Sequence, residues 1–179
     1  MRPAYDAGWQ PQCRFGDRGK KQSPDRELRG RITGHFLPDL LYRLNLKVMH
    51  HTEYLNDLIR NKLITPHQSE LKTVFHNPCE LGRGCGVYAA PDQVLQTVSH
   101  KLATVYDGKN SLCCGGSLAN IHIDPGQRTR ISSDAVKAYL SYQPDLLVTA
   151  CPLCKKTFMK TDTAVPIKDI AEVVAENCR

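Results

Sequence analysis

The sequence predicts an α/β domain in which a small parallel sheet is layered with helices. Short apolar runs alternate with helical segments of about ten residues, a pattern typical of parallel sheets. Of the 179 residues, 41% are apolar and 23% are charged, so the chain can bury a core of its own. The regular pattern starts at Phe36. We therefore expect one domain over residues 36–179, preceded by a leader over residues 1–35.

The first half of the predicted domain contains a helix, a strand and a second helix. Residues 48–63 place apolar side chains at helical spacing, which predicts an amphipathic helix. Residues 71–75 form a short apolar run and predict a strand. Residues 91–100 predict the second helix, because Pro91 stands in its first turn, where proline is well tolerated.

A second strand and a third helix follow. Residues 102–106 predict the strand. Residues 132–142 predict the helix, with Ser132 or Ser133 as its N-cap, because a serine side chain accepts hydrogen bonds from the first free backbone N–H groups.

The end of the chain returns to the sheet. Residues 146–150 are a continuous apolar run, as in strands that are buried on both faces. Residues 167–177 predict a last helix that begins after Pro166. A short strand over residues 164–165 is expected just before it.

The basic charge belongs mostly to the leader. Residues 1–31 hold eight Lys or Arg against four acidic residues, which accounts for four of the six net positive charges. The leader is rich in Gly, Pro, Arg and Gln and has no apolar period, so we expect it to be disordered. Its aromatic residues are sparse and no nucleic-acid recognition motif accompanies them, so we expect no nucleic-acid partner.

The apolar runs also bear on the compartment. None approaches the roughly 20 residues that a transmembrane helix needs, so we do not expect an integral membrane protein. The first thirty residues contain no signal-peptide core, which favours the reducing cytoplasm. The eight cysteines are therefore expected to do something other than form disulfides.

Five of these cysteines follow predicted strands. Cys79 comes after the first strand, Cys113 and Cys114 lie in a Gly-rich loop after the second, and Cys151 and Cys154 follow the strand over 146–150. Because ligands collect at the carboxyl ends of parallel strands, we expect these five thiols at one edge of the sheet. The last pair is a C-x-x-C motif, whose spacing lets both sulfurs reach one metal centre.

Three interpretations of the five thiols compete. A structural zinc ion takes four ligands and leaves one thiolate surplus. An iron–sulfur cluster presents several irons, so the adjacent Cys113 and Cys114 can bind different irons. A thioredoxin-like dithiol would use only Cys151 and Cys154. The count favours the cluster, and the glycines after Cys114 would let backbone N–H groups approach its sulfur atoms.

The sequence from about residue 47 to residue 178 also resembles a known family, the cysteine-rich CCG domain. This domain occurs in the B and D subunits of heterodisulfide reductases and in the iron–sulfur subunits of glycolate, lactate and anaerobic glycerol-3-phosphate dehydrogenases. The residues that carry the resemblance are His76-Asn77-Pro78-Cys79-Glu80-Leu81-Gly82-Arg83, Gly86-Val87-Tyr88, Pro91, Ser111-Leu112-Cys113-Cys114-Gly115-Gly116 and Val148-Thr149-Ala150-Cys151-Pro152-Leu153-Cys154.

The resemblance implies a cofactor and partners. In the heterodisulfide reductases the matching cysteines bind a noncubane [4Fe-4S] cluster, so it implies the same role for Cys79, Cys113, Cys114, Cys151 and Cys154; some copies of the domain bind zinc. It implies an oxidoreductase subunit that passes electrons between a flavoprotein or ferredoxin-type partner and a disulfide, a quinone or another acceptor. Association with the inner face of the membrane would come through such partners. The alternative is a zinc-stabilised interaction module of a larger assembly.

The sequence departs from the family in two respects. Asn77 and Glu80 stand where the family often has Asp and His, so neither position is expected to handle protons. Family members usually carry two CCG domains, and often a pair of cubane clusters, whereas this chain has one CCG motif set. A second CCG domain, from another subunit or a second copy of the chain, is therefore expected to complete the path.

The remaining cysteines and one histidine have simpler interpretations. Cys85 is expected to be a small buried apolar side chain, because free cysteine is among the most buried residue types. Cys13 and Cys178 lie near the two ends and are expected to take no part. His76, three residues before Cys79, is expected to support the site from the end of its strand.

Overall fold

The computed structural model describes residues 49–116 and 120–178, so the predicted leader and the start of the predicted domain lie outside the described residues. The elements in chain order are α3 (His51–Arg60), β1 (Lys72–His76), the π-helical turn η1 (Glu80–Gly84), α4 (Ala89–Val98), β2 (His100–Lys101), the 3₁₀ turn η2 (Gly108–Asn110), α5 (Pro125–Leu140), β3 (Leu146–Thr149), α6 (Pro152–Phe158), β4 (Ile167–Asp169) and α7 (Ile170–Asn177). In this part of the chain, no helix is long and apolar enough to cross a membrane.

The four strands form one parallel sheet in the order β2-β1-β3-β4. Thr73 pairs with Leu146 and His76 with Thr149, so β1 and β3 end side by side. The chain leaves β1 toward β2 on one side and later crosses to β3 on the other side. This reversal of direction is the topological switch point where doubly wound α/β proteins bind ligands. The predicted α/β class with a parallel sheet is confirmed.

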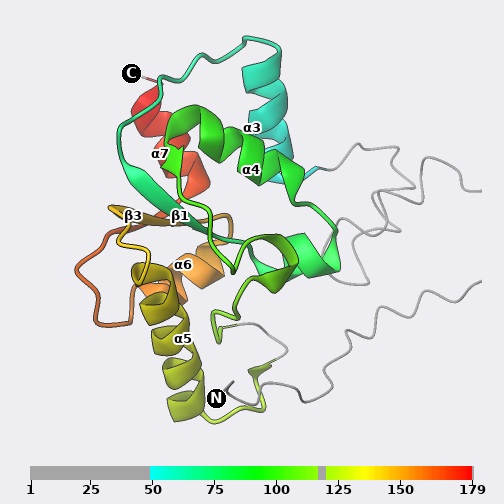
Figure 1. The fold of residues 1–179 in the computed structure, drawn as a ribbon. Coiled ribbons are helices and arrows are strands. Elements are labelled where there is room, and N and C mark those ends of the chain that lie inside the picture. Colours follow the sequence, from blue (N-terminus) through cyan, green and yellow to red (C-terminus); the bar gives the residue numbers. More distant parts are fainter. Residues whose placement is uncertain (1–48, 117–119, 179) are drawn as a thin grey trace, which may run out of the picture.

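Helices cover both faces of the sheet, with α3, α4 and α7 on one face and α5 and α6 on the other (Figure 1). Because side chains alternate along a strand, Phe75 packs with the first group while Val74 packs with the second. Leu95 on α4 and Phe158 on α6 are fully buried in these two cores. Each such side chain stabilises the fold by about 1.5–3 kcal/mol, so the sheet is held from both sides.

The second strand is shorter than predicted and lies earlier. β2 covers only His100–Lys101, whereas the sequence predicts a strand over residues 102–106. The Asp107 carboxylate accepts hydrogen bonds from the backbone N–H and the hydroxyl of Thr104, and it also accepts one from Lys101 Nζ at 3.0 Å. These contacts close a turn immediately after the ladder, so the strand cannot continue.

Two helix starts also differ from the prediction. α5 begins at Pro125, one residue after its N-cap Asp124, and not at Ser132 or Ser133. The last helix begins at Ile170, because Asp169 and Glu172 form a reciprocal capping box. The residues just before it, Ile167–Asp169, form the final strand in place of residues 164–165.

The sequence interpretation did not anticipate α6 or the turn η1. Proline at the first position of α6 and the short length of both elements leave little periodic signal. The helix predicted over 48–63 is confirmed as α3, and the one over 91–100 is confirmed as α4 with a shift of two residues.

Candidate metal centre

Cys79 and Cys151 lie at the switch point of the sheet. β1 ends at His76 and β3 ends at Thr149, and each cysteine follows within three residues of its strand. Since these two strands are direct neighbours, their carboxyl ends deliver both thiols to one place. The order of the strands therefore brings Cys79 and Cys151 to the same edge of the sheet, as expected.

Three hydrogen bonds bring the Cys113–Cys114 loop to the same place. Ser111 Oγ donates to the Asn77 carbonyl at 2.8 Å, and Arg83 Nη1 donates to the Ser111 carbonyl at 2.7 Å. His76 Nε2 lies 3.0 Å from the Leu112 carbonyl oxygen. All three join the residues just before the Cys-Cys pair to the segment that carries Cys79, although this loop does not follow β2 directly.

Backbone and side-chain N–H groups surround the paired cysteines. Gly115 N donates to Cys113 Sγ at 3.3 Å, and Gly116 N donates to Cys114 Sγ at 3.4 Å. Asn120 Nδ2 donates to Cys113 Sγ at 3.4 Å. Such donors stabilise negative charge on sulfur. The two glycines act as the sequence interpretation expected, whereas Asn120 was not singled out.

Cys154 joins the two remaining sulfurs. Its thiol is hydrogen-bonded to both Cys114 and Cys151, and it is itself buried. Hydrogen bonding from Cys154 lowers the pKa of Cys114 to about 7 despite burial. The same contact, with the N–H groups of Leu153 and Cys154 at the start of α6, lowers the pKa of Cys151 to about 6. The proton stays on Cys154, whose pKa is raised by its two sulfur neighbours and by burial.

Cys79 completes the set from the other side. Burial raises the pKa of its thiol, and the nearby sulfurs of Cys113 and Cys114 and the Glu80 carboxylate raise it further. Arg83 opposes this rise. Cys79 is thus within electrostatic reach of the Cys-Cys pair, which is linked through Cys114 and Cys154 to Cys151. Hydrogen bonds thus link Cys114, Cys154 and Cys151, while Cys79 is close enough to Cys113 and Cys114 for their charges to affect its pKa.

The other cysteines differ in their surroundings. Cys85 is partly buried and packs against the core on the α4 side of the sheet, and Cys178 is exposed. Cys13 lies outside the described residues. Among residues 49–116 and 120–178, no three His, Cys, Asp or Glu side chains are arranged to surround a single metal ion.

The different thiol pKa values predict different reactivities. In the metal-free protein at pH 7, Cys151 is mainly a thiolate and Cys79 is a thiol, although both are half-buried. Because the thiolate is the nucleophile, we expect iodoacetamide to modify Cys151 at least roughly ten times faster than Cys79. Mass-spectrometric mapping over time measures the two rates in one sample. Equal rates would contradict the arrangement described for Cys154.

His76 connects the cysteine loop to the sheet. Its ring is fully buried, with its edge against Phe158 at a centroid distance of 4.8 Å. The pKa of His76 is lowered to about 4, mainly by burial and also by the Arg83 charge. The hydrogen bond to the Leu112 carbonyl raises the pKa but does not offset these effects. The ring is therefore neutral at pH 7, with Nε2–H donating to Leu112 and Nδ1 accepting from Thr149 Oγ1 at 3.0 Å. His76 therefore joins the residue before Cys113 to the ends of β1 and β3, and its support of a metal site stays a prediction.

The buried His76 predicts a loss of stability in acid. Its folded pKa of about 4 lies below the ordinary 6.5, so its contribution is complete above pH 6.5 and is lost as the pH falls toward 4. A displacement of this size corresponds to about 3 kcal/mol. We expect His76→Gln to flatten the fall in unfolding free energy between pH 6.5 and 4, measured by guanidinium unfolding. The matched variant His100→Gln, at an exposed histidine, is expected to keep the wild-type slope; the same slope in both variants would contradict this account.

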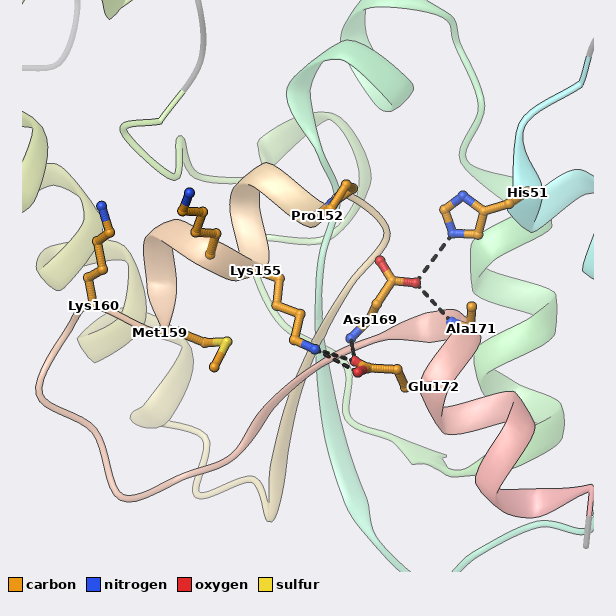
Figure 2. Close-up of a pocket in the computed structure, with 9 residues that line it drawn as sticks. His51, Pro152, Lys155, Met159, Lys160, Asp169, Ala171 and Glu172 are labelled. Carbon is orange, nitrogen blue, oxygen red and sulfur yellow. Dashed lines mark hydrogen bonds and ion pairs between the residues drawn. The ribbon is translucent and has the colours of Figure 1, made fainter.

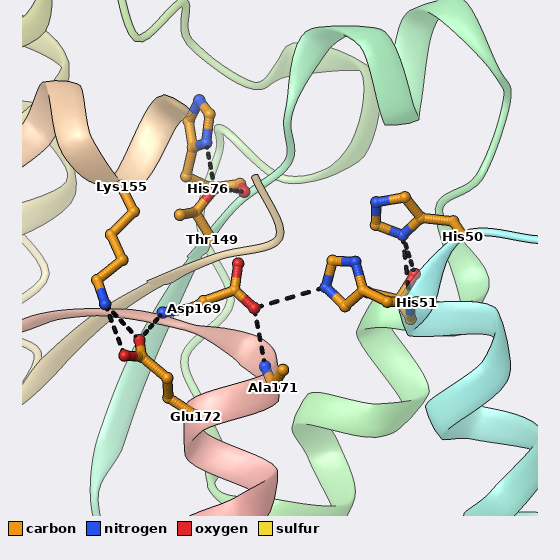
Figure 3. A network of polar contacts seen from close by, with 9 residues as sticks. His50, His51, His76, Thr149, Lys155, Asp169, Ala171 and Glu172 are labelled. Carbon is orange, nitrogen blue, oxygen red and sulfur yellow. Dashed lines mark hydrogen bonds and ion pairs between the residues drawn. The ribbon is translucent and has the colours of Figure 1, made fainter. Parts of the chain in front are cut away.

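A pocket of about 640 Å³ opens beside the C-x-x-C segment, between α3, α6 and α7 (Figure 2). Pro152 stands at its edge. His51 Nε2 lies 3.5 Å from Asp169 Oδ1, and Lys155 Nζ lies 2.6 Å from Glu172 Oε2. Figure 3 shows these pairs close to the His76–Thr149 contact. The sequence interpretation missed this pocket, because its walls come from α3, α6 and the start of α7, which are distant in the sequence and meet only in the fold.

Fold and site together define a class of protein, namely a doubly wound α/β domain that gathers five thiols at its switch point. Comparison with known proteins agrees. Residues 73–159 match the family described as the CCG cysteine-rich domain, and the chain belongs to that family.

Several relatives are named as iron–sulfur or redox proteins. The chain is 34% identical over 158 residues to the D subunit of the dihydromethanophenazine:CoB--CoM heterodisulfide reductase of Methanosarcina mazei, covering 82% of this chain and 36% of the relative. It is 32% identical over 136 residues to a probable membrane-anchored ferredoxin of Chromohalobacter salexigens, covering 72% of this chain and 20% of the relative. It is 24% identical over 140 residues to the probable iron-sulfur-binding oxidoreductase FadF of Bacillus subtilis, covering 73% of this chain and 20% of the relative. The chain thus spans little more than a third of the curated heterodisulfide reductase polypeptide that it matches.

Proposed function

We propose that this chain is an iron–sulfur redox domain that holds a [4Fe-4S] cluster of the noncubane type. The ligands in this proposal are Cys79, Cys113, Cys114, Cys151 and Cys154. The observation that carries it is the linked set of Cys114, Cys154 and Cys151 beside the switch point, with Cys79 within range of the charges of Cys113 and Cys114. The iron–sulfur relatives support the same chemistry.

The residues at the site fit such a cluster. Soft thiolates are the usual ligands of iron–sulfur clusters, and two of the five sulfurs have pKa values of about 6 and 7 before any metal binds. The N–H groups of Gly115 and Gly116 already face sulfur atoms. When bound, the cluster supplies one-electron transfer. Loading must displace the proton of Cys154, so the affinity of the site for iron is expected to rise with pH.

Electrons would have to come from another protein. The chain carries one cysteine motif set and spans about a third of the matching heterodisulfide reductase polypeptide. We propose an electron-donating flavoprotein or ferredoxin-type subunit as the partner, and a disulfide, a quinone or a second cluster as the acceptor. A second CCG domain, from a different subunit or another copy of this chain, would complete the path. A relative of 27% identity is named EtfAB:quinone oxidoreductase, which supports the wider class of acceptors. The proposed location is the cytoplasm, with membrane association only through partners.

A dithiol oxidoreductase is the second candidate, and one observation favours it. Cys151 is the N-cap residue of α6 and has a pKa of about 6, as in C-x-x-C redox motifs at helix starts. This mechanism would use Cys151 and Cys154 alone. It gives no role to Cys79, whose pKa is raised by the charges of Cys113 and Cys114.

Anaerobic redox titration of the purified chain tests the proposal. We expect the visible absorbance to bleach and to recover reversibly as the potential is cycled, with a one-electron slope. Addition of an organic disulfide or a quinone to the reduced protein then identifies the class of acceptor. A purified chain without any reversible visible transition would contradict a role for an iron–sulfur cluster.

A further inference from the structure

A second cavity, of about 270 Å³, lies on the far side of the glycine loop that follows Cys114. Its walls come from the glycine loop, from α5 and from α6. Gly115, Gly116 and Leu153 line it; Gly115 directly follows Cys114 in the sequence, and Leu153 directly precedes Cys154. The cavity is separate from the larger pocket of Figure 2, although Lys160 at the end of α6 contributes to both.

The glycine loop touches both helices at the cavity. A side-chain carbon placed on Gly115 would meet the Arg128 carbonyl oxygen at 2.5 Å, and one placed on Gly116 would meet the hydroxyl of Thr157. The loop backbone therefore lies on α5 and α6 without intervening side chains. Anything bound between these helices is one backbone layer from Cys113 and Cys114, whose sulfurs accept from the same two glycines.

The charge of the cavity is positive and unbalanced. Arg128 and Lys160 line it, and no Asp or Glu of the described residues does so. Arg128 Nε is buried and has no hydrogen-bond partner, and neither cation forms an ion pair within the part of the chain that the structure describes. An unpaired buried donor costs about 1–3 kcal/mol, and more when it is charged. Among the described residues, no group accepts a hydrogen bond from this Nε–H, although the rest of the Arg128 side chain is only partly buried.

The position of Arg128 on its helix adds to the imbalance. It stands four residues after the N-cap Asp124, near the end of α5 where the helix dipole is positive and a cation is disfavoured. The hydroxyls that line the cavity do not offset this charge. Ser132 Oγ donates to the Thr157 carbonyl, and Thr157 Oγ1 donates to the Leu153 carbonyl. Arg128 and Lys160 are thus left as the donors of the cavity.

We propose that this cavity binds the oxyanion of a small organic substrate, as a carboxylate, sulfonate or phosphate. The guanidinium of Arg128 holds two of its oxygens, since its donor geometry matches planar and tetrahedral oxyanions, and Lys160 supplies the second positive charge. Binding there places the rest of the molecule against the cysteine site. The assignment of the bound anion as a substrate rests on the proposed redox function. Binding of the anion depends only on the residues that line the cavity and not on the redox function.

Protection of arginine from phenylglyoxal tests the proposal in the full-length chain, with and without bound iron. Inorganic phosphate, methanesulfonate and acetate are added separately at constant ionic strength, and mass spectrometry follows the modification of Arg128 and Arg130. Arg130 is a matched control within the molecule, because it lies two residues along the same helix and does not line the cavity. We expect at least one anion to slow the modification of Arg128 about tenfold at saturation and to leave Arg130 unchanged.

Variants give a second readout. Arg128→Gln is expected to weaken anion binding by at least about tenfold, as judged by the anion-induced rise in melting temperature, whereas Arg130→Gln keeps the wild-type response. Equal protection of both arginines, or no protection by any of the three anions, would overturn the proposal. The iron content of each sample separates the two hypotheses. Protection of Arg128 in a chain that never binds iron would support the anion site and contradict the redox function. An iron-loaded chain in which no anion protects Arg128 would contradict the anion site and leave the redox function supported.

Discussion

Replacement of Cys79 by serine is expected to remove iron and sulfide from the protein together, whereas the matched replacement Cys85→Ser keeps both. The two cysteines are six residues apart and both are half-buried. They differ in their surroundings, because the charges of Cys113 and Cys114 act on Cys79, whereas Cys85 packs against the apolar core of the α4 face. The thiolate of Cys79 would hold one iron, and serine oxygen is a poor substitute for soft sulfur.

The same pair of variants separates the two candidate functions. A dithiol enzyme that depends on Cys151 and Cys154 keeps its disulfide-reducing activity in Cys79→Ser. An iron–sulfur domain loses iron, visible absorbance and activity together. The measurement is iron and sulfide per chain after anaerobic purification, with circular dichroism to confirm that both variants fold. Full iron content in Cys79→Ser would remove Cys79 from the ligand set.

Replacement of Gly115 by alanine is expected to cost far more stability than the matched replacement Gly108→Ala. Both glycines have positive φ angles, +78° and +59°, which alanine adopts at a cost of about 1–2 kcal/mol. They differ in space. A Cβ on Gly115 meets the Arg128 carbonyl oxygen at 2.5 Å, and a Cβ on Gly108 meets nothing within 4 Å. Overpacking adds about 1–3 kcal/mol, so we expect about 2–5 kcal/mol for Gly115→Ala.

Gly115→Ala also displaces the N–H group that donates to Cys113 Sγ, so we expect its iron content to fall. Guanidinium unfolding followed by circular dichroism gives the two free energies of unfolding. Similar losses in both variants would show that the close approach of the glycine loop to α5 does not constrain the site.

Cysteine spacing predicted that Cys79 and Cys151 lie together, because each follows a strand that the apolar pattern makes visible. The runs at 71–75 and 146–150 predict strands, and the carboxyl ends of parallel strands meet. The loop of Cys113 and Cys114 is held near the end of β1 by contacts that the sequence interpretation did not consider. Side-chain hydrogen bonds from Ser111 and Arg83, and not the end of β2, carry it to the switch point.

Other features depend on contacts between distant segments. Arg128 reaches the site only because α5 begins at Pro125, seven residues before the predicted start. The sequence contains a signal for that start, because Asp124 is an N-cap residue followed by proline. It also contains a signal for the start of α7, namely the capping box formed by Asp169 and Glu172. The His51–Asp169 pair had no local signal, since it forms when α3 packs against α7.

Metal and sulfide analysis of the anaerobically purified chain tests the central claim most directly. We expect about four iron and about four acid-labile sulfide per chain, together with an electron paramagnetic resonance signal in one oxidation state. About one zinc per chain, with neither iron nor sulfide, would contradict this claim and would identify the five thiols as a structural site of an interaction module.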